Sequence, residues 1–186
     1  VIESTPTGLF DGPEEVGNID GHTVGTADGL DSIHSILLRS NDQAVDYNFY
    51  EYTPAQISGI VFQDGETIVV PSELQVADVV APAGEISINA RRLHGVEITL
   101  TNLTTGNTAR ALTNAQGEFS FAGLAQGTYK LNENQPMGFH DGIDHAGTAG
   151  GTVAAEHDQI TNIELAFGQI ATDYFFSEYR VRIVAP

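Results

Sequence analysis

Apolar and polar residues alternate along short stretches of the chain, and this two-residue period predicts β-strands. The alternation is clearest in residues 96–102, where Val96, Ile98 and Leu100 share one face of the predicted strand. It recurs in residues 118–121, where Phe119 and Phe121 share a face. Because the 3.6-residue period of an amphipathic helix is almost absent, the pattern predicts an all-β protein.

Turn signals separate the predicted strands about every 6–12 residues. Thr105, Gly106 and Asn107 predict a hairpin that joins residues 96–102 to a return strand over 108–113. Two further turns follow, one over residues 114–117 and one over residues 123–127. Short strands joined by tight turns are typical of an antiparallel sandwich.

The chain also contains a long internal repeat. Residues 1–12 match residues 131–142 at Glu3 and Glu133, and they share a proline, a glycine and an Asp-Gly pair at the same offset. The similarity continues with residues 21–24 against 150–153 and closes with DYNFYEY at 46–52 against DYFFSEY at 173–179. The repeat predicts two domains, the C-terminal half of one module in residues 1–52 and a complete module in residues 53–186.

The half-module and the complete module each contain one stretch without a clear period. In the half-module, residues 1–3, 33–38 and 44–51 predict three strands, while residues 11–30 predict an acidic, glycine-rich loop. Three strands bury little apolar surface, so we expect a neighbouring repeat or a second copy of the chain to cover this sheet edge. In the complete module, residues 63–92 predict an inserted excursion with some strand or one helical turn.

The charge of the chain narrows the classes of partner. It has 25 acidic and 7 basic residues, a formal net charge of −18 and no cysteine. This charge repels nucleic acid and anionic lipid and attracts cations. No apolar run approaches the ~20 residues that a membrane-spanning helix needs, so we expect neither nucleic-acid binding nor membrane insertion.

Two phrases in the complete module resemble a known family. They are G-x-F-x-F-x-x-L-x-x-G-x-Y at residues 117–129 and E-x-x-P-x-G at residues 133–138, followed by DYFFSEY. This series resembles the SdrD-like and Cna-B-like B-type repeat modules of bacterial surface proteins. The resemblance implies a seven-stranded, transthyretin-like Greek-key sandwich. It also implies a non-enzymatic stalk or spacer module of an adhesin-like protein, at the bacterial cell surface or secreted.

Some modules of this family carry an intramolecular isopeptide bond, and Glu133 matches the acidic residue that assists its formation. The lysine that the bond requires on the first strand is missing from residues 56–62, and Lys130 lies on the opposite face of its strand from Glu133. We therefore expect no such crosslink. Counting along the strand places Glu133 on the inward face, with Tyr129 and Leu131.

Other relatives bind calcium, and the sequence offers candidate ligands for it. Hard cations require several oxygen atoms that converge on one point. The candidate calcium ligands are Asp141, Asp144 and Glu133 in the complete module and Asp11, Glu14 and Glu3 in the half-module. Glu15 and Asp20 are further acids near the ligands of the half-module, and Asp64 and Glu66 form a second candidate group. The alternative interpretation is that the Asp-Gly pairs form turns and the acids are solvated.

A second functional hypothesis is a binding module that recognises an extracellular protein or a glycan. It would use the excursion at 63–92 and the loop at 11–30, because long loops on sandwiches often carry function. An enzyme is not predicted, and no residue is assigned a catalytic role. The chain has no G-x-S-x-G nucleophile motif, P-loop or dinucleotide-binding motif.

Overall fold

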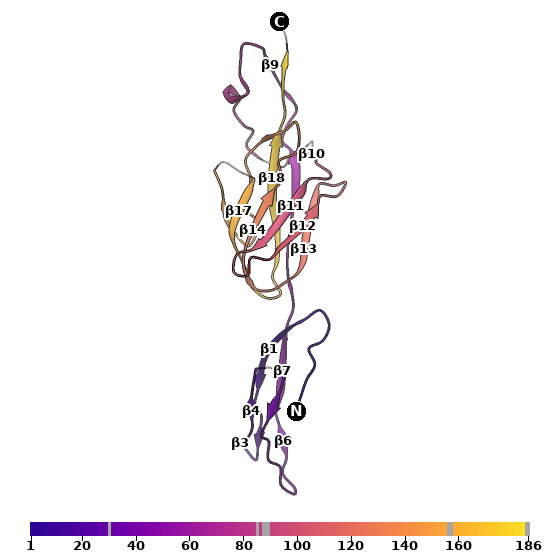
Figure 1. Ribbon diagram of the computed structural model, residues 1–186, viewed down its shortest axis with the longest axis vertical. Coiled ribbons are helices and arrows are strands. Elements are labelled where there is room, and N and C mark those ends of the chain that lie inside the picture. The colour runs from indigo at the N-terminus through magenta and orange to yellow at the C-terminus, as the bar shows by residue number, and fades with distance from the viewer. Residues whose placement is uncertain (30, 85, 87–89, 156–157, 185–186) are drawn as a thin grey trace. The chain divides into compact units, whose positions relative to one another are not determined.

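The computed structural model describes residues 1–186 apart from 30, 85, 87–89, 156–157 and 185–186, and it is all-β (Figure 1). The chain divides into two compact units, Val1–Pro54 and Ala55–Pro186. The one helical element in the described part is a single 3-10 turn, η1 (Val76–Asp78). No helix in that part is long and apolar enough to cross a membrane.

The described part of the second unit is built around two five-stranded sheets. The first sheet contains β8 (Ala55–Gln63), β10 (Arg91–Arg92), β13 (Glu118–Leu124), β15 (His140–Asp141) and β18 (Ile170–Tyr179). In this sheet, β18 pairs with β8 and β15, while β13 and β10 pair with successive parts of the other edge of β8.

The second sheet contains β11 (Glu97–Asn102), β12 (Thr108–Leu112), β14 (Gly127–Glu133), β16 (Thr152–Val153) and β17 (Gln159–Leu165). Its strand order is β12-β11-β14-β17-β16. Seven of these strands are five residues or longer, and three have two residues.

The alternating apolar residues form the core of this unit. Ile98 and Leu100 of β11 are buried, as are Phe119 and Phe121 of β13, which confirms the faces predicted from the sequence. The largest side chains without solvent exposure include Tyr174 and Phe176 of β18. They pack in the core with Ile57, Val61, Leu131, Ile160 and Ile163.

Gly59 allows β8 to pack in this core. A Cβ atom at this position would lie 2.0 Å from the Tyr174 carbonyl oxygen and 2.6 Å from Cζ of Phe119. Because the first of these atoms belongs to the backbone of the paired strand, it cannot move away without disturbing the ladder. We predict that Gly59→Ala lowers the free energy of unfolding by about 2–3 kcal/mol. Urea unfolding checks this, with Ser58→Ala on the same strand as the control, and an unchanged midpoint would contradict it.

The first and last long strands of the second unit run side by side in the same direction. β8 and β18 are parallel from Gln56 opposite Ile170 to Gln63 opposite Glu178, with one irregularity. The pairing continues beyond the sheet, because β9 (Ile68–Pro71) and β19 (Val181–Val184) are also parallel partners. Two backbone hydrogen bonds connect the two ladders, from Asp64 N to Glu178 O at 2.7 Å and from Ile68 N to Arg180 O at 2.8 Å. The N-terminal segment β8–β9 and the C-terminal segment β18–β19 of the unit are therefore paired along most of their length.

The excursion at 63–92 contains both kinds of local structure that its sequence predicts. Strand β9 lies near its start, and η1 provides one helical turn. Near its end, the Gly84 N–H donates to Oδ2 of Asp64 at 2.8 Å, and this bond ties the excursion back to its first residues. The part of the predicted excursion at 85 and 87–89 lies outside the described residues.

The described residues of the first unit form seven short strands, so the prediction of three strands is wrong in detail. Residues 33–38 are strand only over two residues, and residues 1–3 contribute one bridge, from Ile2 to Ser32. The strands are β1 (Phe10–Glu15), β2 (Asn18–Ile19), β3 (His22–Thr23), β4 (Thr26–Ala27), β5 (Ile33–His34), β6 (Ala44–Val45) and β7 (Asn48–Tyr52).

Strand β1 lies almost entirely in residues 11–30, over which the sequence predicts an acidic, glycine-rich loop, and it contains an Asp-Gly-Pro sequence. It nevertheless pairs antiparallel with β7, and the register shifts between Asp11 and Glu14. A bulge of this kind tolerates Pro13, which cannot donate a ladder hydrogen bond. Asp46 has a positive φ of 63° and separates β6 from β7, which were predicted as one strand.

The two units repeat the same local packing. The Tyr47 hydroxyl donates to Val24 O at 2.6 Å, and the Tyr174 hydroxyl donates to Gly150 O at 3.0 Å. Val24 therefore corresponds to Gly150, and the proposed match of 21–24 with 150–153 is wrong. The hairpin of β2 and β3 is additional chain in the first unit, and a chance Gly-x-Thr-Val similarity hid it.

Candidate cation site

Five carboxylates of the second unit converge between its two sheets, and we call them the carboxylate cluster. Glu133 ends β14, and Asp158 directly precedes β17, so both belong to the second sheet. Glu178 near the end of β18 and Asp141 of β15 belong to the first sheet, and Asp144 follows β15. They form two groups, Glu133–Asp158–Glu178 and Asp141–Asp144–Asp158, each with ligand oxygens within 4.8 Å of one another.

Regular strand geometry directs these side chains inward. Glu133 follows Tyr129 and Leu131 on the buried face of β14 and is 8% exposed, as its period predicts. Glu178 follows Tyr174 and Phe176 along β18 and has no solvent exposure. A backbone bond from Glu133 N to Asp158 O at 2.8 Å places Asp158 beside the end of β14. The Ser177 N–H donates to Asp144 Oδ1 at 3.1 Å.

Five of the ten carboxylate oxygens in the cluster are buried without a hydrogen-bond partner. Both carboxylate oxygens of Glu133 are buried without a hydrogen bond, as is one oxygen each of Glu178, Asp141 and Asp158. The second oxygen of Glu178 accepts a bond from the side-chain amide of Gln135. Buried carboxylate oxygens without partners are costly, because burial removes the water that would solvate their charge.

In the part of the chain that the structure describes, no positive side chain forms an ion pair with these carboxylates. Among the described residues, the ion pair that the structure contains is Arg110–Glu97, which lies on β12 and β11. Asp141 and Glu178 are direct cross-strand partners, and like charges in this position destabilise a sheet. The cluster therefore requires either protons or an external cation.

The pKa values of the cluster carboxyl groups are raised, because burial and neighbouring negative charges disfavour their ionised forms. Burial raises the pKa of Glu133 well above its usual range, and the charges of Glu178 and Asp158 add to this effect. Burial also raises the pKa of Asp144 to about 7. Burial and a hydrogen bond with Asp141 raise the pKa of Asp158 to about 8. For Glu178, burial raises the pKa to about 9 despite the opposing bond from Gln135.

The first unit contains a second cluster with the same arrangement. Its groups are Glu3–Asp31–Glu51 and Asp11–Glu14–Asp31. Glu3 N donates to Asp31 O at 2.9 Å, as Glu133 N does to Asp158 O, and Asp11 is the cross-strand partner of Glu51, as Asp141 is of Glu178. Oxygens of Glu3, Asp31 and Glu51 lack partners, and Asp11 is exposed. This cluster is more open to solvent than that of the second unit.

Partial desolvation also raises pKa values in the first unit. The pKa of Asp11 rises further through a hydrogen bond with Asp31, and that of Glu51 through the charge of Glu3.

The structure brings all six predicted ligands into these clusters, three in each unit. It places the other candidates elsewhere. Glu15 accepts bonds from Tyr50 and Asn48, and Asp20 lies in the turn between β2 and β3. Asp64 accepts the Gly84 bond, and neither it nor Glu66 belongs to a group of converging acids in the described part of the chain.

Four cluster members were missed in the sequence, and the repeat could have identified them. They are Asp31, Asp158, Glu51 and Glu178. Asp31 and Asp158 each stand two residues before an isoleucine that is matched between the two copies of the repeat. Glu51 and Glu178 occupy the same position in the closing motifs DYNFYEY and DYFFSEY.

The residues of both clusters fit a hard divalent cation. Calcium takes 6–8 oxygen ligands, including carboxylates that bind through one or two oxygens. Glu133 and Glu178 belong to a group with converging oxygens, and both oxygens of Glu133 and one of Glu178 have no hydrogen-bond partner that would compete for this role. A bound cation would supply positive charge between the sheets. Cluster residues would hold it from both sheets at once.

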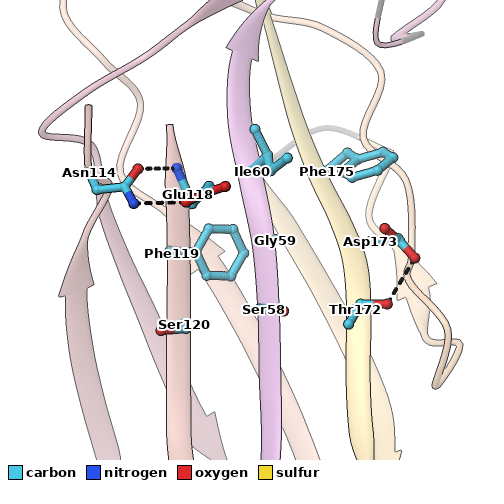
Figure 2. Close-up of a pocket in the computed structure, with 10 residues that line it drawn as sticks. All are labelled: Ser58, Gly59, Ile60, Asn114, Glu118, Phe119, Ser120, Thr172, Asp173 and Phe175. Atoms are coloured by element: carbon cyan, nitrogen blue, oxygen red, sulfur yellow. Dashed lines mark hydrogen bonds between the residues drawn. The ribbon is translucent and has the colours of Figure 1, made fainter. Parts of the chain in front are cut away.

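A separate hollow lies on the first sheet and has different chemistry (Figure 2). It has a volume of about 280 Å³ and is lined by β8, β13 and β18. Asn114 and Glu118 bond to each other at one side, and the Thr172 hydroxyl donates to Asp173 at the other. The lining is mixed polar and apolar and contains no converging group of acids.

The end of the excursion lines a second, larger hollow of about 620 Å³. Its lining residues include Gly84 and Ile86 of the excursion, together with His145, Thr148 and Phe175. This concave surface contains an aromatic ring and is where the predicted excursion meets the sandwich.

Parts of the chain are similar to known proteins. Residues 83–174 match the family profile of the SdrD B-like domain. No curated protein matches the chain. Among solved structures, a double mutant of the shaft pilin SpaA from Lactobacillus rhamnosus GG is 14% identical, with a TM-score of 0.39. That match covers 70% of this chain and 51% of the pilin.

Two further structures are similar at comparable levels. The backbone protein of the group B streptococcus pilus 2b is 16% identical, with a TM-score of 0.36 and coverage of 86% of this chain and 53% of that one. An adhesin from Mobiluncus mulieris with intramolecular disulfide, isopeptide and ester cross-links is 11% identical. Its TM-score is 0.38, with coverage of 89% and 54%. The chain spans about half the length of these structures.

Proposed function

We propose, from the premise that residues 83–174 form an SdrD B-like domain, that the protein is a load-bearing stalk or spacer module. It would belong to an adhesin-like protein at the bacterial cell surface or secreted from the cell. Its partners would be neighbouring repeats of the same chain. No residue of the described part is assigned a catalytic role in this proposal.

The observation that carries the proposal is the parallel pairing of β8 with β18. Because the strands are parallel, the start of β8 and the end of β18 lie at opposite ends of their ladder. A force that pulls these two ends apart loads the hydrogen bonds in shear, so many must break together. The ladder of β9 and β19 adds four register pairs to this arrangement. A module that transmits tension benefits from this geometry.

The carboxylate cluster supports a second part of the proposal, that calcium stiffens the module. Glu133 and Asp158 belong to one sheet, and Glu178 belongs to the force-bearing strand of the other. A cation held by all three would couple the sheets at the end of β18. Calcium would thus strengthen the strand that carries the load.

Single-molecule pulling tests the mechanical role. The chain has no cysteine, so introduced cysteines give unique attachment points. With Thr53→Cys and Arg182→Cys, force follows the parallel ladder, and we predict an unfolding force several-fold higher than in the control geometry. The control is Thr105→Cys with Arg182→Cys, which pulls on the hairpin of β11 and β12. Equal forces in the two geometries would contradict the proposal.

The larger hollow favours a second candidate function, recognition of an extracellular protein or a glycan. The excursion residues Gly84 and Ile86 line it with the ring of Phe175, so it offers a concave surface with apolar and polar contacts. Screening the chain against extracellular matrix proteins and a glycan array would test this function. Retained binding by a Phe175→Ala variant would exclude this hollow as its site.

A further inference from the structure

The carboxylate cluster has two positions for a cation, and one aspartate belongs to both. Glu133, Asp158 and Glu178 form the first position, and Asp141, Asp144 and Asp158 form the second. Within each position the ligand oxygens lie within 4.8 Å of one another. Asp158 is the one residue that the two positions share. A carboxylate has two oxygens, so it can contact a different cation with each.

The charge of the cluster also favours two cations. Five ionised carboxylates carry five negative charges, of which one divalent cation neutralises two and two cations neutralise four. No positive side chain forms an ion pair with these residues in the described part of the chain. A single cation would leave several buried charges close together, and such charges are costly. Two cations leave one negative charge for the whole cluster.

A second observation, independent of the clustering, points to a ligand. Glu133 is 8% exposed, and both of its carboxylate oxygens are buried without a hydrogen-bond partner. Glu178 is fully buried, and one of its oxygens is likewise unpartnered. Because neither oxygen of Glu133 has a partner, the oxygen that Glu133 offers to the first position is unpartnered whichever of the two it is. The sandwich thus encloses acceptor atoms for which the described residues supply no donor.

The same two-position arrangement occurs in the first unit. There Asp31 takes the place of Asp158 and belongs to both groups. The surrounding chain has changed, since the β2–β3 hairpin is present in one copy only. All five acidic positions are nevertheless retained, with Glu14 in place of Asp144 as the one difference of residue type. A solvated acidic surface would not require this correspondence.

We propose that each unit holds a pair of divalent cations bridged by one aspartate, Asp158 in the second unit and Asp31 in the first. The inference rests on the proposed calcium binding and adds its stoichiometry and its bridging residue. The pair would join β14 and the start of β17 to β15 and the end of β18. The chain as a whole would hold four cations, with the two in the first unit more accessible to solvent.

Native mass spectrometry of the full chain with added Ca²⁺ tests the stoichiometry. We expect four bound cations in the wild type. Glu133→Gln and Asp144→Asn each remove a ligand from one position, so each should leave three. Asp158→Asn removes the bridge and should leave two, as should Asp31→Asn. Asp173→Asn is the matched control, because Asp173 is an exposed acid of β18 outside the cluster, and it should retain four.

The outcomes separate this inference from the proposed function. Two cations in the wild type, one of which is lost in both Glu133→Gln and Asp144→Asn, would mean one cation per unit and overturn the pair. No bound cation would refute the proposed calcium binding itself. Equal losses in Asp173→Asn and Asp158→Asn would mean adventitious binding to surface acids and would also overturn the pair. Should Asp158→Asn not fold, the counts of the two single-position variants decide.

Discussion

Removing divalent cations should lower the melting temperature of the second unit by more than about 10 °C. A cation at 1,000-fold excess over its dissociation constant adds about 4 kcal/mol to the free energy of unfolding. Each kcal/mol shifts the melting temperature of a domain of this size by about 2–8 °C. The expected shift is large because chelation leaves the five carboxylates of the cluster without a compensating charge.

Differential scanning calorimetry of the full chain measures this effect, first with a chelator and then with excess Ca²⁺. Mg²⁺ at the same concentration is the control for general screening, because it prefers near-ideal octahedral geometry and retains its water. Glu178→Gln should lose most of the calcium-dependent shift, whereas Asp173→Asn should keep it. Identical melting temperatures with chelator and with calcium would refute a stabilising cation at this site.

The inward position of Glu133 could be predicted from the sequence, and the function of the site could not. The two-residue period places Glu133 with Tyr129 and Leu131, and all three are buried. Periodicity describes one strand at a time, however. The convergence of Glu133 and Glu178 depends on how two sheets pack, and no local pattern contains that information. The candidate ligands from the sequence were therefore incomplete.

The position of Asp158 could not be predicted from strand periodicity. This residue precedes β17 and is set beside Glu133 by a backbone hydrogen bond, so its role comes from chain position and not from strand alternation. The β1 strand was missed for a related reason. Its Asp-Gly-Pro sequence has the composition of a turn, but tertiary pairing with β7 overrides that local preference. Comparison of the two copies of the repeat is a stronger signal for these ligands than strand alternation. Both copies have an aspartate at positions 31 and 158 and a glutamate at positions 51 and 178.

In the absence of cations, the stability of the second unit should fall as the pH rises from about 4 to about 9. The carboxyl groups have pKa values near 4 in the unfolded chain. In the folded unit, the pKa values of Asp144, Asp158 and Glu178 rise to about 7, 8 and 9. Between these limits the folded state binds more protons than the unfolded state, so the free energy of unfolding decreases with pH. Below pH 4 both states are protonated, and this contribution to stability is fully present.

Bound calcium should reverse this dependence, because cations and protons compete for the same oxygens. Affinity rises as the carboxylates lose their protons, so the calcium-loaded chain should gain stability between pH 5 and pH 8 while the chelated chain loses it. Melting temperatures across this range, with and without calcium, measure both slopes. Glu178→Gln removes one of the raised groups and should flatten the chelated slope, which Asp173→Asn should leave unchanged. A chelated chain that became more stable toward pH 8 would mean that the cluster is ionised and tolerated without a cation. The proposed role of calcium in the sandwich would then lose its physical basis.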